Sequence, residues 1–266
     1  MTSDSLRKYN LIIMAGGTGG PLQESTGHAH KAMIEIHGKP MIEWVIDAFA
    51  DNPRIERIVV VGPSELDDLA CMERVRKRLP AGSNIVQNAL EGMTYLRNRF
   101  YFGAAYHPGY LISYCDAVFL NAEIVEETLV AFAERDADVA LTYVEKATFE
   151  KAGLHAKRTY IPIPDKHYDK HFTGGTICYA ASMRLLTPVL TKIHEMRKVR
   201  KDPMGLLNVL GCAGKGIAEI ETRIGEILDA PAHIHVSAHP EIGMDVDKPS
   251  DLELAEEWLG GPDGPG

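Results

Sequence analysis

The chain has 266 residues, of which 45% are hydrophobic and 24% charged, and its formal net charge is −9. This length and apolar content suit one large α/β domain. Because a strongly acidic protein is a poor non-specific binder of nucleic acid and of anionic membranes, neither is expected as a partner. A site for phosphate groups would therefore need local positive charge or a metal ion.

The cysteines and the first residues bear on where the protein works. The four cysteines at positions 71, 115, 178 and 212 are far apart and form no CxxC pair, which argues against structural zinc and for reduced thiols. Residues 1–10 are polar and do not resemble a signal peptide, and no apolar run approaches the length of a membrane span. We expect a cytoplasmic protein.

Strand and helix patterns alternate along the first half of the chain. Apolar runs predict strands at residues 11–14, 57–62, 110–115 and 138–144. Helical spacing of apolar residues predicts helices at residues 40–50, 66–79, 88–106 and 122–135. This order predicts an α/β fold in which helices cover both faces of a mainly parallel sheet, a three-layer α/β/α Rossmann-like architecture.

The second half is less regular. We expect strands at residues 160–164, 171–180 and 233–238, and helices at 185–200, 204–211 and 249–259. No linker or repeat separates the halves, so the sequence predicts a single domain over residues 1–260. Residues 261–266, Gly-Pro-Asp-Gly-Pro-Gly, are expected to form a disordered tail.

A glycine-rich turn follows the first predicted strand. Gly16, Gly17, Gly19 and Gly20 are four glycines in five residues, and Lys31 follows. Backbone N–H groups of such a turn can close on phosphates, and a nearby cation can neutralise their charge. A P-loop is excluded because no Lys follows Gly20, and a dinucleotide fingerprint would need a glycine at Leu22. A tight turn without a ligand is the alternative, although so many glycines cost chain entropy.

Carboxylates follow two other predicted strands. Asp116 ends the strand at 110–115, where it could hold Mg²⁺ or simply cap the next helix. Asp245 and Asp247 would point the same way in an extended segment, and Asp251 fits the first turn of the last helix as a cap. Ligands of α/β proteins bind beyond the carboxyl ends of the strands, where the glycine turn and Asp116 are both expected.

Several segments together resemble the MobA-like NTP transferases, the GT-A-like nucleotidyltransferase family. These segments are Met14-Ala15-Gly16-Gly17-Thr18-Gly19-Gly20-Pro21, His30-Lys31, Gly38-Lys39-Pro40, Cys115-Asp116 with Leu120, and Asp245-Val246-Asp247-Lys248-Pro249-Ser250-Asp251-Leu252. The resemblance implies transfer of NMP from an NTP to a phosphorylated small-molecule acceptor, with release of pyrophosphate and with Mg²⁺ or Mn²⁺ as cofactor.

The resemblance also implies roles for individual residues. Lys31 and Asp116 would be catalytic, and Asp116 with Asp245 or Asp247 would hold the metal. The nucleotide would contact a set of residues in the first half of the chain: Ala15, Gly16, Gly17, Thr18, Gly19, Gly20, Lys31, Gln87 and Asn88. Gln87 and Asn88 are expected just before a helix. Arg158, Gly174 and Gly175 would line the acceptor side.

Departures from the family pattern keep other functions open. Pro21 stands where the family usually has Arg, and His30 where it usually has Pro. Because Pro carries neither charge nor an N–H donor, His28 or His30 would have to compensate, or the chain is a non-catalytic nucleotide-binding or regulatory protein with a decayed site. A glycosyltransferase using a nucleotide-sugar is a further alternative, although Asp116-Ala117-Val118 lacks the Asp-x-Asp that it would usually want.

Overall fold

The computed structural model describes residues 6–17, 19–154, 158–165, 169–185, 205, 207–208 and 210–260. The chain divides into two compact units, one formed by residues 1–129 and 244–266 and the other by residues 130–243. Whether the chain folds as the single predicted domain of residues 1–260 stays a prediction. Thr18, the tail at 261–266 and most of the two helices expected between 185 and 211 lie outside the described residues.

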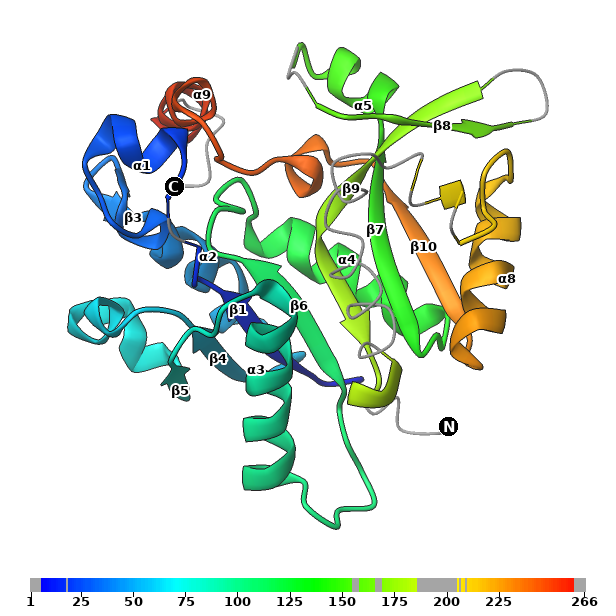
Figure 1. The fold of residues 1–266 in the computed structure, drawn as a ribbon, viewed down its shortest axis with the longest axis horizontal. Helices are drawn as coiled ribbons and strands as arrows, with labels where there is room; N and C mark the ends of the chain where they lie inside the picture. The colour runs from blue at the N-terminus through cyan, green and yellow to red at the C-terminus, as the bar shows by residue number, and fades with distance from the viewer. Residues whose placement is uncertain are drawn as a thin grey trace. The chain divides into compact units, whose positions relative to one another are not determined.

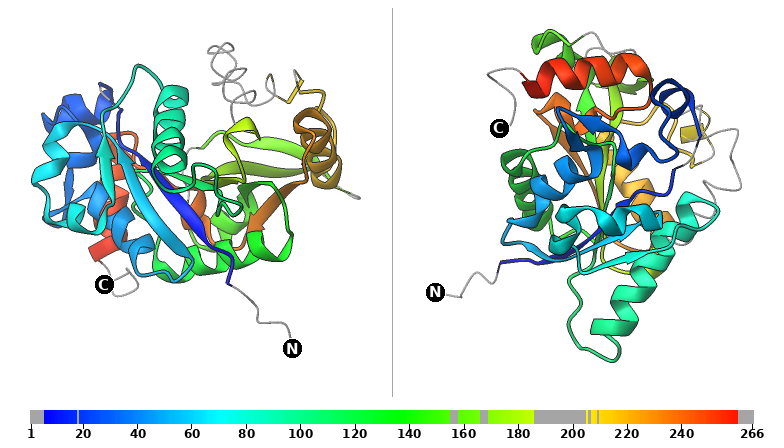
Figure 2. Two further views of the ribbon diagram at one scale, coloured as in Figure 1. Left: turned by 90° about the horizontal axis from the view of Figure 1, so that it is seen from below. Right: turned by 90° about the vertical axis from the view of Figure 1, so that its left-hand side faces the viewer.

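The first unit contains four parallel strands paired in the order β6, β1, β4, β5. Their bounds are β1 Tyr9–Met14, β4 Ile55–Val61, β5 Lys77–Leu79 and β6 Tyr110–Tyr114. All six residues of β1 are buried, as expected for a parallel strand covered on both faces. Helix α3 (Ile85–Phe100) lies on one side of these strands and α2 (Met41–Ala50) on the other (Figures 1 and 2). The predicted layered α/β arrangement is therefore present here.

Shorter elements complete the first unit. They are α1 Pro21–Thr26, η1 Lys31–Met33, β2 Glu35–Ile36, β3 Lys39–Pro40, η2 Ser64–Asp68, η3 Ala70–Arg74, the start of α4 Ala122–Glu134, and α9 Pro249–Gly260. Helix α3 approaches β1 closely at Gly92, where an added Cβ would lie 2.8 Å from Cγ2 of Ile12. The Tyr9 hydroxyl donates to the carbonyl of Leu129 in α4, 3.2 Å away. These contacts fix the helices that surround the strand leading into the glycine-rich turn.

The helix expected at residues 66–79 is wrong. Two 3₁₀ helices, η2 and η3, occupy its first part, and Leu69 and Val75 after them have extended backbones. Its last residues form β5, which pairs with β4 from Val59 to Val61. The amphipathic pattern was present, but pairing with an exposed strand edge outweighed the helical preference of this segment.

The second unit is a mixed sheet. Strand β7 (Val139–Glu145) pairs in parallel with β10 (Ala232–Ser237) and antiparallel with β9 (Asp169–Ala180), which pairs antiparallel with β8 (Ile161–Pro164). Helix α5 (Lys146–Lys151), α8 (Ile217–Leu228) and η5 (Pro240–Gly243) complete it. Its apolar core includes Ile161, Ile163, Phe172, Leu207, Cys212, Ile220 and Ile234. The strands predicted here are confirmed, whereas α5 and α8 were not foreseen.

No helix in the described part of the chain combines the length and the apolar character that a membrane span requires.

Candidate functional site

The glycine-rich turn and Asp116 begin at the same edge of the first unit's sheet. Met14, the last residue of β1, pairs with Tyr114 at the end of β6, and the N–H of Cys115 donates to the carbonyl of Met14 at 3.1 Å. The chain segments that leave these two strands therefore start side by side, at the carboxyl edge where α/β proteins bind their ligands.

Two structural requirements, close packing and a positive φ angle, explain glycines of the turn. A Cβ on Gly16 would lie 2.6 Å from Cβ of Ala81 and 2.7 Å from Nδ2 of Asn88, so packing excludes a side chain there. Gly19 and Gly20 have φ angles of +73° and +137°, which L-residues rarely adopt. A Cβ on Gly17 or Gly19 would meet no atom within 4 Å. The backbone of the turn is thus fixed on one side and open on the other.

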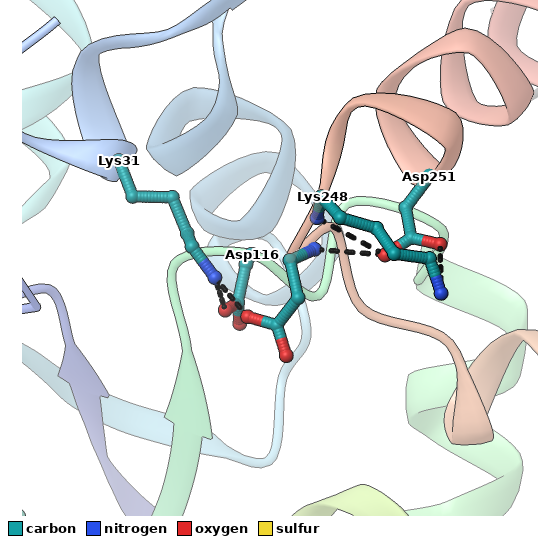
Figure 3. Close-up of polar contacts among 5 residues, drawn as sticks. Lys31, Asp116, Lys248 and Asp251 are labelled. Atoms are coloured by element: carbon teal, nitrogen blue, oxygen red, sulfur yellow. Dashed lines mark hydrogen bonds and ion pairs between the residues drawn. The ribbon is translucent and has the colours of Figure 1, made fainter. Parts of the chain in front are cut away.

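Lys31 connects this edge of the sheet to two carboxylates. Its ammonium donates to Oδ2 of Asp116 at 2.8 Å and to Oδ1 of Asp247 (Figure 3). The side chains of Lys31 and Asp116 are 13% and 16% exposed, whereas that of Asp247 is 64% exposed. Lys31 therefore joins two carboxylates that are far apart in sequence, of which Asp116 is nearly buried and Asp247 is exposed at the surface.

Asp245 belongs to the same group. One oxygen from each of Asp116, Asp245 and Asp247 lies within 4.8 Å of the others, and the described residues contain no other group of three or more potential metal ligands of this kind. The N–H of Val246 donates to the carbonyl of Asp116 at 3.1 Å, which ties the segment before α9 to the end of β6. The structure thus brings together four residues that the sequence predicted for one site.

The electrostatics of this group favour an added cation. Three carboxylates lie close together here, and the ammonium of Lys31 pairs with two of them. Burial by itself would lower the pKa of Lys31, but Asp116 and then Asp247 outweigh it and raise that pKa. Burial raises the pKa of Asp116, and the nearby Asp245 and Asp247 add to this despite the opposing effect of Lys31. Several carboxylate oxygens close together are the donor set that Mg²⁺ and Mn²⁺ prefer.

Asp251 does more than cap the last helix. Its Oδ2 accepts hydrogen bonds from the backbone N–H groups of Asp247, at 3.1 Å, and Lys248, at 3.2 Å (Figure 3). It therefore fixes the backbone that carries the Asp247 carboxylate. From the sequence, Asp251 is expected only to cap the helix; its spacing of four residues from Asp247 is the signal for this second contact.

The position expected for Gln87 and Asn88 is wrong. Both lie inside α3, whose N-cap is Asn84, rather than just before the helix. Oδ1 of Asn88 accepts from the N–H of Gly82 at 2.6 Å, and Oε1 of Gln87 accepts from the N–H of Ser83 at 2.9 Å. These bonds shape the turn before α3, next to Gly16. Contact with a base or ribose stays a prediction.

The residues predicted for the acceptor side all lie in the second unit. A Cβ on Gly175 would lie 2.1 Å from Oγ1 of Thr142, so this glycine is required by packing between β9 and β7. A Cβ on Gly174 would meet nothing within 4 Å, and Arg158 is partly buried. Packing therefore explains one glycine of the pair, and the acceptor role of all three stays a prediction.

Pro21 and the nearby histidines show how the chain differs at the turn. Pro21 is the first residue of α1, a place where its missing N–H costs nothing. Nε2 of His30 lies 3.6 Å from Oε1 of Glu65, while its Nδ1 is buried without a hydrogen-bond partner. His28 is exposed. Compensation by either histidine for the missing arginine stays a prediction.

The candidate site thus has an ammonium among aspartates at the carboxyl edge of a parallel sheet, where a glycine-rich turn also begins. The model of the MobA-like NTP transferase domain matches residues 11–201, and the chain belongs to this family. The predicted enzyme class, nucleotidyltransferase, is thereby confirmed at the level of the family.

Solved structures show the same fold. A hypothetical transferase from Thermus thermophilus is 25% identical, with a TM-score of 0.71 and coverage of 92% of this chain and 99% of the other. The 4-diphosphocytidyl-2C-methyl-D-erythritol synthase from Anaerococcus prevotii is 15% identical, with a TM-score of 0.55 and coverage of 96% and 99%. A CMP:2-keto-3-deoxy-manno-octonic acid synthetase complexed with CTP is 16% identical, with a TM-score of 0.56 and coverage of 95% and 98%. The predicted α/β, mostly parallel architecture is confirmed.

One curated relative matches over a short stretch. The bifunctional enzyme IspD/IspF of Hyphomonas neptunium is 34% identical over 82 residues, which are 31% of this chain and 21% of that enzyme. The matching region spans about a fifth of the relative's length, so its similarity supports the family and not a particular substrate.

Proposed function

We propose that this chain is a divalent-metal-dependent nucleotidyltransferase that moves NMP from an NTP to a phosphorylated small-molecule acceptor. The observation that carries the proposal is the group formed by Lys31, Asp116, Asp245 and Asp247 at the strand edge where the glycine-rich turn begins. A negatively charged group of carboxylates would repel a triphosphate unless a cation stands between them. The family to which the chain belongs supports an NTP as the substrate.

Each part of the group has a role in this reaction. An oxygen of the acceptor phosphate bonds to the α-phosphorus, the bond from that phosphorus to the β-phosphate bridging oxygen breaks, and pyrophosphate leaves. Backbone N–H groups of the turn, from Ala15 to Gly20, would hold the phosphates, and Lys31 would neutralise charge as it builds on the leaving group. Asp116 with Asp245 or Asp247 would hold Mg²⁺ or Mn²⁺, which neutralises phosphate charge when bound.

Phosphorylated acceptors are proposed from the family resemblance, and Arg158 could supply positive charge to such a group. The synthetase complexed with CTP has the same fold, which supports a nucleoside triphosphate as the donor. The experiment screens the base of the donor and the acceptor together.

The test is a screen for pyrophosphate release. The full chain is mixed with Mg²⁺, each of the four common NTPs in turn, and a pool of phosphorylated metabolites. We expect release with one NTP in an acceptor-dependent manner, and its loss in Asp116→Asn. Stabilisation against heat by an NTP without any turnover would instead support the regulatory protein with a decayed site, for which Pro21 is the argument. Turnover of a nucleotide-sugar without pyrophosphate release would support the glycosyltransferase.

A further inference from the structure

Lys31 contacts two of the three carboxylates that the proposed metal ion would use. Its ammonium contacts Oδ2 of Asp116, at 2.8 Å, and Oδ1 of Asp247, and both residues belong to the three-carboxylate group. A divalent cation takes carboxylate oxygens at about 2.0–2.6 Å. An ion bound to these oxygens would thus lie in contact with the ammonium, and two positive charges at that separation repel strongly.

We infer that Lys31 is an internal counter-ion that competes with the divalent cation for Asp116 and Asp247, and that it is released to the nucleotide phosphates when metal and NTP bind together. The inference rests on the proposed function, since it assigns the metal to these carboxylates. Lys31 then has two positions: one on the carboxylates, and one on the phosphates.

The surroundings of Lys31 allow such a change without a change of fold. The backbone of Lys31 is held in η1, where its carbonyl accepts from the N–H of Ile34 at 3.1 Å, and the next residue, Ala32, is fully buried. The side chain carries its ammonium on a flexible four-carbon stem. Rotation about the side-chain bonds can therefore move the charge while the strand ends and the turn remain in place.

This competition couples the metal to the nucleotide. Without phosphates, a metal ion that displaces Lys31 leaves a nearly buried ammonium without its carboxylate partners, which is unfavourable. With an NTP present, the phosphates offer new acceptors to the same ammonium. Metal and nucleotide should consequently each increase the affinity for the other.

The test measures Mn²⁺ affinity by calorimetry without nucleotide in the wild-type chain and in Lys31→Met. Methionine has a similar length and no charge. We expect Lys31→Met to bind Mn²⁺ on the order of 10-fold or more tightly than the wild type, because the competing charge is gone. Lys31→Arg, which keeps the charge, should bind as weakly as the wild type.

Lys248→Met is the matched control. Lys248 is a neighbour of Asp247 in sequence, but its ammonium pairs with Oδ1 of Asp251 at 3.5 Å and points away from Asp116 (Figure 3). The variant removes the same charge from the same region without touching the contact of Lys31. Its Mn²⁺ affinity should stay within about 2-fold of the wild type, since solvent and salt screen exposed charges.

Two different failures can be told apart. Equal Mn²⁺ affinity of wild type and Lys31→Met would overturn the competition and leave the metal site standing. Absence of Mn²⁺ binding in both chains, with and without NTP, would overturn the proposed function and the inference together. Should Lys31→Met not fold, NMR of the lysine ammonium groups in the wild-type chain decides: the Lys31 signal should shift when Mg²⁺ and a non-hydrolysable NTP are added, and an unchanged signal contradicts the inference.

Discussion

Two places in the first unit have a cation between two aspartates, and they differ in burial and in charge balance. At the candidate site, Lys31 lies between Asp116 and Asp247. On the surface beside α2, Arg74 lies between Asp47 and Asp51, and Lys39 also pairs with Asp47. Asp51 is 92% exposed, whereas Asp116 is 16% exposed.

The difference shows which of the two networks suits a ligand. In the surface network two cations balance two carboxylates, and water screens each pair, so it contributes little free energy. At the candidate site a third carboxylate, Asp245, lies close to Asp116 and Asp247, and charges in a partly buried position are screened less by water. A bridging ion pair alone therefore does not indicate a ligand site, whereas three carboxylates grouped in a partly buried position offer the oxygen donors that a divalent cation prefers.

The largest effect should come from Asp116→Asn. The substitution removes a carboxylate that is only 16% exposed while keeping the side-chain shape, so we expect turnover to fall on the order of 10³-fold and Mn²⁺-dependent NTP binding to be lost. Calorimetry with Mn²⁺ and NTP measures the binding. Asp51→Asn in the surface network is the control and should change neither quantity. Equal NTP affinity of the wild type in EDTA and in Mn²⁺ would contradict the metal role of Asp116.

Lys31→Ala should have the second-largest effect on turnover. A cation that neutralises the leaving group acts more on the transition state than on bound substrate, so we expect turnover to fall about 10²–10³-fold and NTP affinity to fall less. Steady-state rates at saturating metal, with binding measured separately, give the two quantities. Lys39→Ala, from the surface network, should leave the rate unchanged. If the rate of Lys31→Ala is also unchanged, Lys31 has no part in the reaction.

The ionisation of the Cys71 thiol depends on charged residues of the surface network. Burial, together with the charges of Glu43 and Asp47, raises the pKa of its thiol to about 11, although Arg74 opposes the shift. At pH 8 its thiolate fraction should be about 10²-fold below that of a free cysteine, and its alkylation rate should rise steadily from pH 7 to 9. Peptide mapping after timed iodoacetamide treatment measures this rate. The rate should increase about tenfold between pH 8 and 9, and an increase of only about 3-fold, as for a free cysteine, would contradict the raised pKa.

Asp251→Asn should have a smaller effect, through the position of Asp247. The variant weakens the hydrogen bonds to the N–H groups of Asp247 and Lys248, and groups that orient a metal ligand are typically worth 10–100-fold in metal affinity. We expect a loss of this size in Mn²⁺ affinity with NTP present. Glu253→Gln, an exposed change on the same helix, is the control. Loss of affinity in both variants would point to the helix charge and not to the backbone contact.

The smallest effect is expected from Arg74→Gln. Exposed ion pairs contribute about 0–1 kcal/mol, so the free energy of unfolding in urea should fall by no more than about 1 kcal/mol. The difference from the wild type should shrink as salt is added. A salt-independent loss of several kcal/mol would show that the surface network resembles the candidate site more than its exposure suggests.

The sequence predicted the parts of the fold whose signal is local. The apolar runs that became β1, β4 and β6 needed no partner to be recognised, because a strand buried on both faces is apolar throughout. The helix predicted at residues 66–79 was wrong because the end of this segment pairs with β4. The amphipathic pattern is visible in the sequence, whereas the pairing with β4 is not. Helix α8 (Ile217–Leu228) is a different case, because Ile217, Ile220, Ile224 and Leu228 have helical spacing and the signal for this helix is local.

The sequence by itself determined the chemistry of the site: a glycine-rich turn after a buried strand, one lysine, and carboxylates at strand ends in two distant segments. Only the tertiary structure decided that Lys31 touches Asp116 and Asp247, that Asp251 holds the backbone of Asp247, and that Gln87 and Asn88 shape a turn. Residue types follow from local requirements of charge and backbone conformation. Contacts between residues 31, 116 and 247 depend on how strands and helices pack, which no local pattern records.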